Sequence, residues 1–123
     1  MTFRLKFTAN LKGRLKILTN KILTLLGFAA KAGKLSFGMQ MSVDDIKKGK
    51  TKLTLIASDV SQKSQKEVMF FSHNKNISVI TLKDITIDDI SNAVGKKCGI
   101  ISVKDNGFAD AISNIIGGNA DDQ

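Results

Sequence analysis

The sequence lacks proline, tryptophan and tyrosine, and it contains one cysteine and one histidine among 123 residues. A single cysteine excludes an internal disulfide and a zinc site built from several cysteines, so we expect a reducing, cytoplasmic location. No apolar run approaches the roughly 20 residues that cross a bilayer, so we expect no membrane partner. The basic first residues also lack the apolar core and the cleavage site of a secretory signal peptide.

Acidic residues are scarce in the first part of the chain, and the net charge of +8 is unevenly distributed. Residues 1–52 carry 12 Lys and Arg against two Asp, a balance of +10. Residues 53–123 carry seven Lys against nine acids, a balance of −2. One strongly basic half indicates a surface for a polyanion such as nucleic acid. The alternative is a basic surface that only keeps the protein in solution.

All seven aromatic residues are phenylalanine. Five of them lie within apolar patterns and are expected in the core: Phe28, Phe37, Phe70, Phe71 and Phe108. Only Phe3 and Phe7, in the segment FRLKF, alternate with basic residues. Proteins that bind single strands stack bases on exposed aromatic side chains. With so few exposed aromatics expected, structured RNA is a better prediction than single-stranded RNA.

Helical and strand patterns alternate along the chain. Helices are predicted at residues 15–32, 38–48, 64–74, 86–94 and 108–116. Strands are predicted at residues 35–37, 52–57, 77–82 and 98–103. The third helix is placed by Ser64 and Glu67, which match a capping box. This order predicts an α/β fold with helices on both faces of a sheet. We expect one domain at residues 15–116, between a basic N-terminal tail (1–14) and a flexible tail (117–123).

No catalytic or metal-binding constellation is visible. The segment from Gly27 to Leu35 imitates a phosphate-binding P-loop, but five residues separate its glycines instead of four. Leu35 also offers no hydroxyl group for magnesium, and the segment follows a helix instead of a strand. His73 has no recognisable nucleophile or orienting partner, and Cys98 fits a small core residue. We therefore predict no enzymatic activity, no cofactor and no metal.

Three connections have features of a binding site. Gly38 opens a helix among lysines, and a helix N-terminus offers unpaired N–H groups to phosphates or base edges. Residues 57–61 leave a strand where an α/β sheet presents its binding loops. Residues 95–100 combine two glycines with two lysines. Each is an ordinary connection when taken alone, but the three could gather at one end of the molecule.

Four motifs resemble those of a known family: KILTLLGFAAKAGKLSFG (21–38), LTLIASDVS (53–61), ISVITL (77–82) and AVGKKCGIISVKDNGFADAI (93–112). On these residues the chain resembles the kink-turn RNA-binding superfamily of ribosomal proteins of the L7Ae and L30e type, most closely its bacterial YlxQ-like branch. The resemblance covers residues 17–116. It implies a three-layer α-β-α sandwich with a small mixed four-stranded sheet and no enzymatic activity. It also implies binding to a kink-turn, a sharply bent internal loop built on tandem sheared G·A pairs.

The resemblance implies RNA contacts at matching positions of this chain. These are Lys34, Gly38, Met39, Gln40, Ser58, Asp59, Gly95, Lys96, Lys97, Cys98 and Gly99, with Lys31 as a nearby phosphate contact. The ribosomal relatives carry Gly-x-Asn-Glu where this chain has Gly38-Met39-Gln40-Met41. Gln40 still offers a donor and an acceptor to a purine edge, whereas Met41 lacks the carboxylate.

We therefore predict a cytoplasmic, monomeric, non-enzymatic protein that binds structured, kink-turn-like RNA and associates with the ribosome through ribosomal RNA. The alternative is a protein-interaction module that docks an acidic partner through its basic face.

Overall fold

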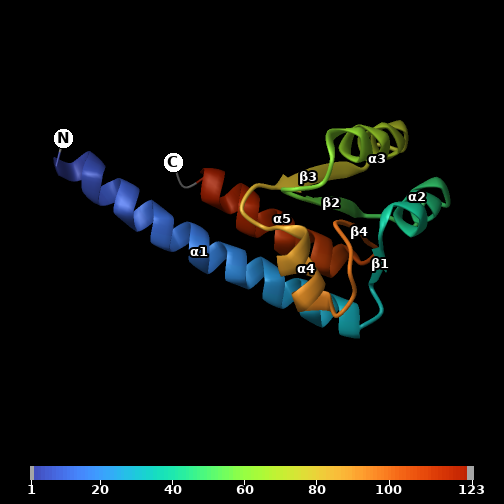
Figure 1. Ribbon diagram of the computed structural model, residues 1–123, viewed down its shortest axis with the longest axis horizontal. Coiled ribbons are helices and arrows are strands. Elements are labelled where there is room, and N and C mark those ends of the chain that lie inside the picture. The colour runs from blue at the N-terminus through green and yellow to red at the C-terminus, as the bar shows by residue number, and fades with distance from the viewer. Residues whose placement is uncertain (1, 122–123) are drawn as a thin grey trace.

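The computed structural model describes the backbone of residues 2–121 and the side chains of residues 16–117. Within these residues the chain forms five helices and four strands (Figure 1). In chain order they are α1 (Thr2–Lys31), β1 (Leu35–Phe37), α2 (Met39–Lys47), β2 (Leu53–Ala57), α3 (Gln62–Asn74), β3 (Ser78–Leu82), α4 (Ile87–Val94), β4 (Ile100–Val103) and α5 (Asn106–Asp121). No described helix is long and apolar enough to cross a membrane.

The four strands form one mixed sheet, as predicted, and their order in it is β1-β4-β2-β3. β2 and β3 are parallel, whereas β4 runs antiparallel to both β1 and β2. As a result β1, β2 and β3 terminate at the end of the sheet where β4 begins. We call this the Gly99 end, and we call the opposite end, where β1, β2 and β3 begin, the Lys34 end.

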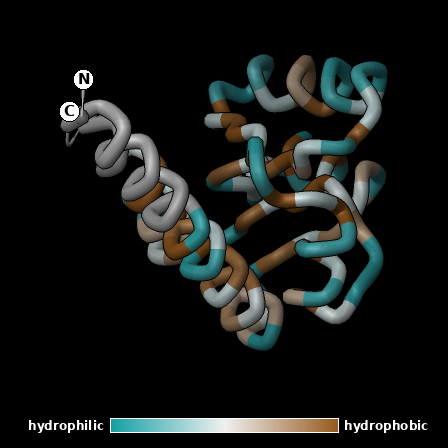
Figure 2. The backbone as a smooth tube through the Cα atoms, turned by 60° about the vertical axis from the view of Figure 1, so that its left-hand side comes forward, coloured by the Kyte–Doolittle hydropathy of each residue, from teal (hydrophilic) through white to brown (hydrophobic). Residues whose placement is uncertain are grey.

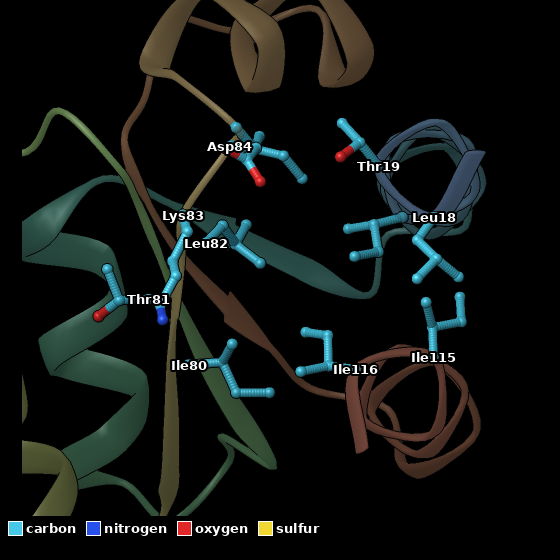
Figure 3. Close-up of a pocket in the computed structure, with 11 residues that line it drawn as sticks. Leu18, Thr19, Ile80, Thr81, Leu82, Lys83, Asp84, Ile115 and Ile116 are labelled. Atoms are coloured by element: carbon cyan, nitrogen blue, oxygen red, sulfur yellow. The ribbon is translucent and has the colours of Figure 1, made fainter. Parts of the chain in front are cut away.

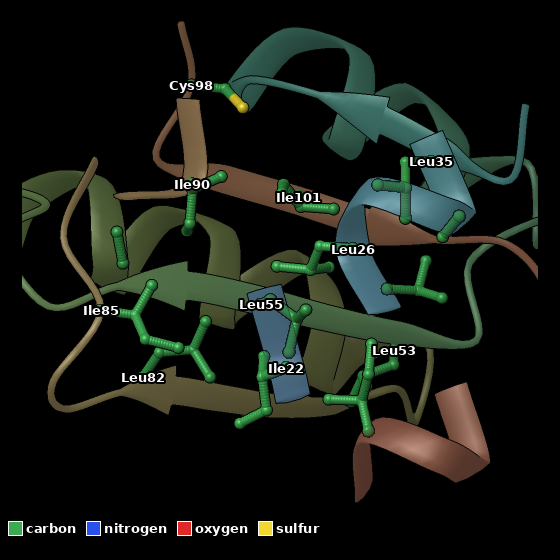
Figure 4. Close-up of a cluster of buried hydrophobic side chains, with 14 of the residues drawn as sticks. Ile22, Leu26, Leu35, Leu53, Leu55, Leu82, Ile85, Ile90, Cys98 and Ile101 are labelled. Carbon is green, nitrogen blue, oxygen red and sulfur yellow. The ribbon is translucent and has the colours of Figure 1, made fainter. Parts of the chain in front are cut away.

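Helices cover both faces of the sheet, which confirms the predicted three-layer sandwich (Figure 1). One face packs against α1, α4 and α5. In Figure 4, Leu26 of α1 lies beside Leu55 of β2 and Ile101 of β4, and all three are fully buried. The hydropathy colouring of Figure 2 shows the strands as hydrophobic segments inside hydrophilic outer turns. This face therefore forms the main apolar core.

The other face, under α2 and α3, combines apolar packing with buried hydroxyl groups. Strand residues alternate between faces, so Thr54 lies beneath α3 while its neighbours Leu53 and Leu55 point to the main core. The hydroxyl groups of Thr54 and Ser72 lie 3.0 Å apart, within hydrogen-bonding distance. Such pairs satisfy buried polar groups and fix where each helix sits on the sheet.

Two helix starts differ from the sequence prediction. α3 begins at Gln62 because Ser61 is its N-cap and accepts a hydrogen bond from the backbone N–H of Ser64, at 3.3 Å. The predicted Ser64 capping box is therefore wrong, since Ser61 offers the same hydroxyl three residues earlier. α5 begins at Asn106 because the Asp105 carboxylate accepts from the N–H of Phe108, at 3.0 Å. The helix thus starts two residues before the predicted residue 108.

Three other bounds also differ. α1 begins at Thr2, not near residue 15, and α5 continues to Asp121. The side chains of residues 1–15 and 118–123 lie outside the described part, so the roles of Phe3 and Phe7 stay predictions. β4 begins at Ile100, so residues 98 and 99 belong to the preceding loop and not to the predicted strand.

Two phenylalanines predicted in the core are exposed. Phe28 is 57% exposed and Phe70 is 61% exposed, whereas the other three are half-buried. Each exposed ring lies two residues beyond a fully buried one, Leu26 or Val68, and such positions fall on opposite sides of a helix. The prediction failed because both lie in apolar runs whose helical period turns them outward.

Candidate nucleic-acid interface

Backbone hydrogen bonds join three loops at the Gly99 end of the sheet. The N–H of Gly38 donates to the carbonyl of Ile100, at 2.8 Å, which fixes the start of α2 beside the start of β4. The N–H of Ala57 donates to the carbonyl of Gly99, also at 2.8 Å. The start of α2, the β2–α3 loop and the α4–β4 loop therefore form one continuous surface.

Gly99 allows these loops to pack closely. A Cβ atom at position 99 would lie 2.7 Å from Cγ2 of Val60 and 2.8 Å from Cγ1 of Ile87. Both distances are shorter than carbon atoms tolerate. Because glycine has only a hydrogen atom in place of a Cβ, the β2–α3 loop and the start of α4 can pack against the residue before β4. Sequence reasoning missed Val60 and Ile87, because nothing in their local sequence marks them as packing partners.

The first turn of α2 presents its backbone donors without a side-chain cap. Gly38 is the N-cap, with φ of 88°, a conformation that suits glycine, and no side chain caps this described helix end. The N–H groups of the first turn have no partner within the helix. Gln40 and Met41 are exposed beside them. This turn can therefore offer several donors and one amide side chain to a ligand.

The β2–α3 loop is held by its own hydrogen bonds. The N–H of Ser58 donates to the carbonyl of Ile85, at 2.8 Å. Asp59 is exposed, and its Oδ1 accepts from the N–H of Ile87, at 2.8 Å, which caps the first turn of α4. One carboxylate oxygen of Asp59 is thus used to position α4, leaving Oδ2 as an acceptor for a ligand.

The α4–β4 loop carries the positive charge of this surface. Gly95 follows α4 in the left-handed conformation, and α4 begins with a capping box formed by Thr86 and Asp89. Lys96 and Lys97 are exposed. The Lys96 ammonium lies 5.6 Å from the centre of the Phe37 ring, a separation at which cation and ring attract each other.

Cys98 is turned into the core. Its backbone N–H donates to Oγ of Ser91, at 3.2 Å, and its side chain belongs to the main apolar cluster. Burial raises the pKa of the Cys98 thiol above its ordinary value, against a smaller lowering by the charge of Lys96. The thiol therefore stays neutral, and only the backbone of this residue can face a ligand.

Lys34 lies apart from this surface. It precedes β1 at the Lys34 end of the sheet, where its carbonyl accepts from the N–H of Lys104, at 2.8 Å. β1 separates it from Gly38. Lys31 is exposed in the last turn of α1. The structure thus brings together the predicted residues of the three loops but not Lys34.

A groove of about 330 Å³ lies elsewhere, between β3, α1 and α5 (Figure 3). Its lining includes Ile80, Leu82, Ile115 and Ile116. Among the described residues, no group of three or more His, Cys, Asp or Glu could hold a metal ion. Thr19, Thr81, Lys83 and Asp84 also line the groove beside these apolar side chains.

Comparison with known proteins places the chain among related sequences. Residues 20–113 match the model of the Ribosomal protein L7Ae/L30e/S12e/Gadd45 family. The chain is 31% identical over 98 residues to the RNA-binding protein YlxQ of Enterococcus faecium, covering 80% of this chain and 93% of that protein.

Solved structures share the fold. A protein of unknown function from Bacillus halodurans is 28% identical and has a TM-score of 0.74, covering 79% of this chain and 97% of that one. The 15.5 kD RNA-binding protein of Giardia lamblia has a TM-score of 0.64 at 16% identity, covering 82% and 86% of the two chains.

Proposed function

Because the chain belongs to the L7Ae/L30e/S12e/Gadd45 family of ribosomal proteins, we propose that it binds RNA through the Gly99 end of its sheet. The observation that carries this proposal is the pair of backbone hydrogen bonds, from Gly38 and Ala57, that joins three loops into one surface. The RNA-binding protein YlxQ, which matches most of this chain, supports RNA as the ligand.

We propose further that the RNA is structured and kink-turn-like, and that ribosomal RNA is its source. A kinked RNA crowds its phosphates together, so a basic surface binds the bent state more tightly than the open state. Differential affinity of this kind shifts the RNA population towards the bent form. In this protein the exposed ammonium groups of Lys31, Lys96 and Lys97 would supply the attraction.

We propose that the first turn of α2 recognises particular bases. The backbone N–H groups after Gly38 can meet phosphate or base acceptors, and the Gln40 amide can pair with a purine edge. Met41, which is 52% exposed, adds apolar surface where a carboxylate would accept hydrogen bonds. Lysines then provide salt-dependent affinity, while Gln40 provides discrimination.

The test is a titration of the protein against two RNAs at two salt concentrations. One RNA contains a kink-turn, and its copy replaces the tandem G·A pairs with Watson–Crick pairs. A strong preference for the kink-turn supports the proposal. Equal affinity for the two RNAs with a steep salt dependence would mean that the protein binds RNA without recognising the kink-turn. Absence of binding to either RNA would turn attention to an acidic protein partner.

A further inference from the structure

A second group of lysines gathers at the Lys34 end of the sheet. We call it the lysine patch, and it consists of Lys34, Lys47, Lys48, Lys50, Lys52 and Lys104. Lys104 is half-buried and the other five are exposed. The N–H of Lys104 donates to the carbonyl of Lys34, at 2.8 Å, and the N–H of Lys52 donates to the carbonyl of Val103, at 2.7 Å. Lysines from three separate segments therefore meet on adjacent strands.

The register of the sheet turns these lysines towards one face. Leu35, Val103 and Leu53 lie side by side in neighbouring strands and belong to the main core. Lys34, Lys104 and Lys52 each lie one residue beyond this row. Successive side chains of a strand point to opposite faces, so the lysines continue the opposite face, the one that α2 covers. α2 ends over this face and adds Lys47, Lys48 and Lys50.

Local acids do not neutralise the patch. A helix C-terminus carries about half a negative charge, which one or two lysines would balance. Asp44 and Asp45 lie on α2, where Ser36 donates a hydrogen bond to Asp45, and Asp105 caps α5. Three carboxylates and a helix end thus face six lysines. A helix-capping role alone does not account for the remaining charge.

An exposed aromatic ring lies beside the patch. The Lys47 ammonium is 4.8 Å from the centre of the Phe71 ring, and the Phe70 ring is packed edge-to-face on Phe71, 5.4 Å away between centres. Phe70 is 61% exposed. Exposed aromatic rings beside cationic side chains are the features that bind unpaired nucleotides, with bases stacked on the ring and phosphates near the charges.

We propose that the lysine patch and Phe70 form a second RNA-binding surface, which takes a single-stranded segment. This inference rests on the RNA binding proposed above and adds a separate site. β2 has five residues and spans about 16 Å, so the two ends of the sheet can be occupied together. Asp44 is exposed on α2 between Gln40 and Lys47. Its negative charge separates the lysine patch from the Gly99 end along this helix. A structured RNA would then bind the Gly99 end, and a single strand that leaves it would bind the lysine patch.

The direct probe is a short oligouridylate, which has no secondary structure. Replacing three exposed lysines of the patch (Lys48→Gln, Lys50→Gln and Lys52→Gln together) should weaken its binding. The slope of log affinity against log salt should fall by up to about 0.7 for each phosphate that a lysine no longer neutralises. The matched control carries Lys16→Gln, Lys21→Gln and Lys83→Gln, which remove the same charge from exposed positions outside the patch.

The aromatic contribution is tested separately. Phe70→Ala should weaken oligouridylate binding about fivefold or more, because bases can no longer stack on the ring while the charges remain. Phe28→Ala is the matched control, since Phe28 is 57% exposed on α1 on the other side of the sheet. It should change the affinity less than twofold. Equal effects in both variants, or none in either, would overturn the role of Phe70.

A kink-turn RNA without single-stranded ends separates this inference from the proposed function. The lysine-patch variant should bind it as tightly as the unaltered protein. Weaker binding of both probes by the same factor would mean one diffuse basic surface and would overturn the second site, as would the absence of oligouridylate binding. If the kink-turn preference fails but oligouridylate binding still depends on the patch, the proposed function falls and the second surface stands.

Discussion

At the scale of single residues, the packing of the loops at the Gly99 end depends on Gly99, because no side chain larger than a hydrogen atom fits there. Gly99→Ala would place a methyl group against Val60 and Ile87. Overpacking of this kind typically costs about 1–3 kcal/mol of folding free energy, and here it also pushes the loops apart. We expect a lower urea midpoint together with weaker RNA binding.

The matched control is Gly117→Ala in α5, where an added Cβ meets nothing within 4 Å. Alanine suits a helix better than glycine, so this variant should be as stable as the unaltered protein or slightly more so. If Gly99→Ala behaves in the same way, the close contact at Gly99 does not hold the loops.

Gln40 is the residue that we propose recognises bases. Gln40→Ala should cost about 1–3 kcal/mol of binding free energy on the kink-turn RNA and little on its Watson–Crick copy, because only the kink-turn exposes the recognised edges. Gln62→Ala, in the first turn of α3 and also exposed, serves as the control. An equal decrease on both RNAs would show that Gln40 contacts the backbone alone.

At the scale of elements, α4 is the helix whose bounds were most accurately predicted, at 86–94 against the observed Ile87–Val94. Thr86 and Asp89 cap each other's backbone N–H groups, and Gly95 closes the helix with φ of 79°. Thr86 and Gly95 mark the two ends of this helix in the local sequence, so its bounds can be predicted from the sequence alone. The start of α3 was harder to predict, because Ser61 and Ser64 each carry a hydroxyl group that can cap a helix. Only packing selects between them.

The α4 cap can be tested by its stability. Thr86→Ala removes the side-chain acceptor of the Asp89 N–H, at 3.2 Å, and removal of such an N-cap costs about 0.5–2 kcal/mol. Urea unfolding should show this decrease. Thr24→Ala in α1 is the control, since the Thr24 hydroxyl donates only to Asn20 within the same helix. A decrease equal to that of the control would contradict the role of the cap.

At the scale of the whole molecule, the main core joins α1 to the sheet. Leu26 is fully buried beside Leu55 and Ile101 (Figure 4). Leu26→Ala should lower the free energy of unfolding by about 2–5 kcal/mol, through reduced burial and the cavity left behind. Ile17→Ala, at a position 56% exposed on the same helix, should change it by about 0.5 kcal/mol or less. Similar values for both would contradict the packing of α1.

Each loop of the candidate site could be identified from the sequence, but the positions of the loops relative to one another could not. Gly38 and the glycines at 95 and 99 were identifiable because left-handed turns and close contacts favour glycine. The position of Lys34 was not, because it follows from β1 pairing with β4. That pairing joins residues more than sixty positions apart, and local patterns carry no information about it.

The strand order also sets when the molecule becomes complete during its synthesis. β4 lies between β1 and β2, yet it is the last strand to leave the ribosome. Until residues 100–103 emerge, β1 has no partner in the sheet and the N–H of Gly38 has no carbonyl to meet. A nascent chain therefore carries the lysines of the first half without the assembled loops. The RNA contact that we propose for the Gly99 end therefore requires β4 to have been made.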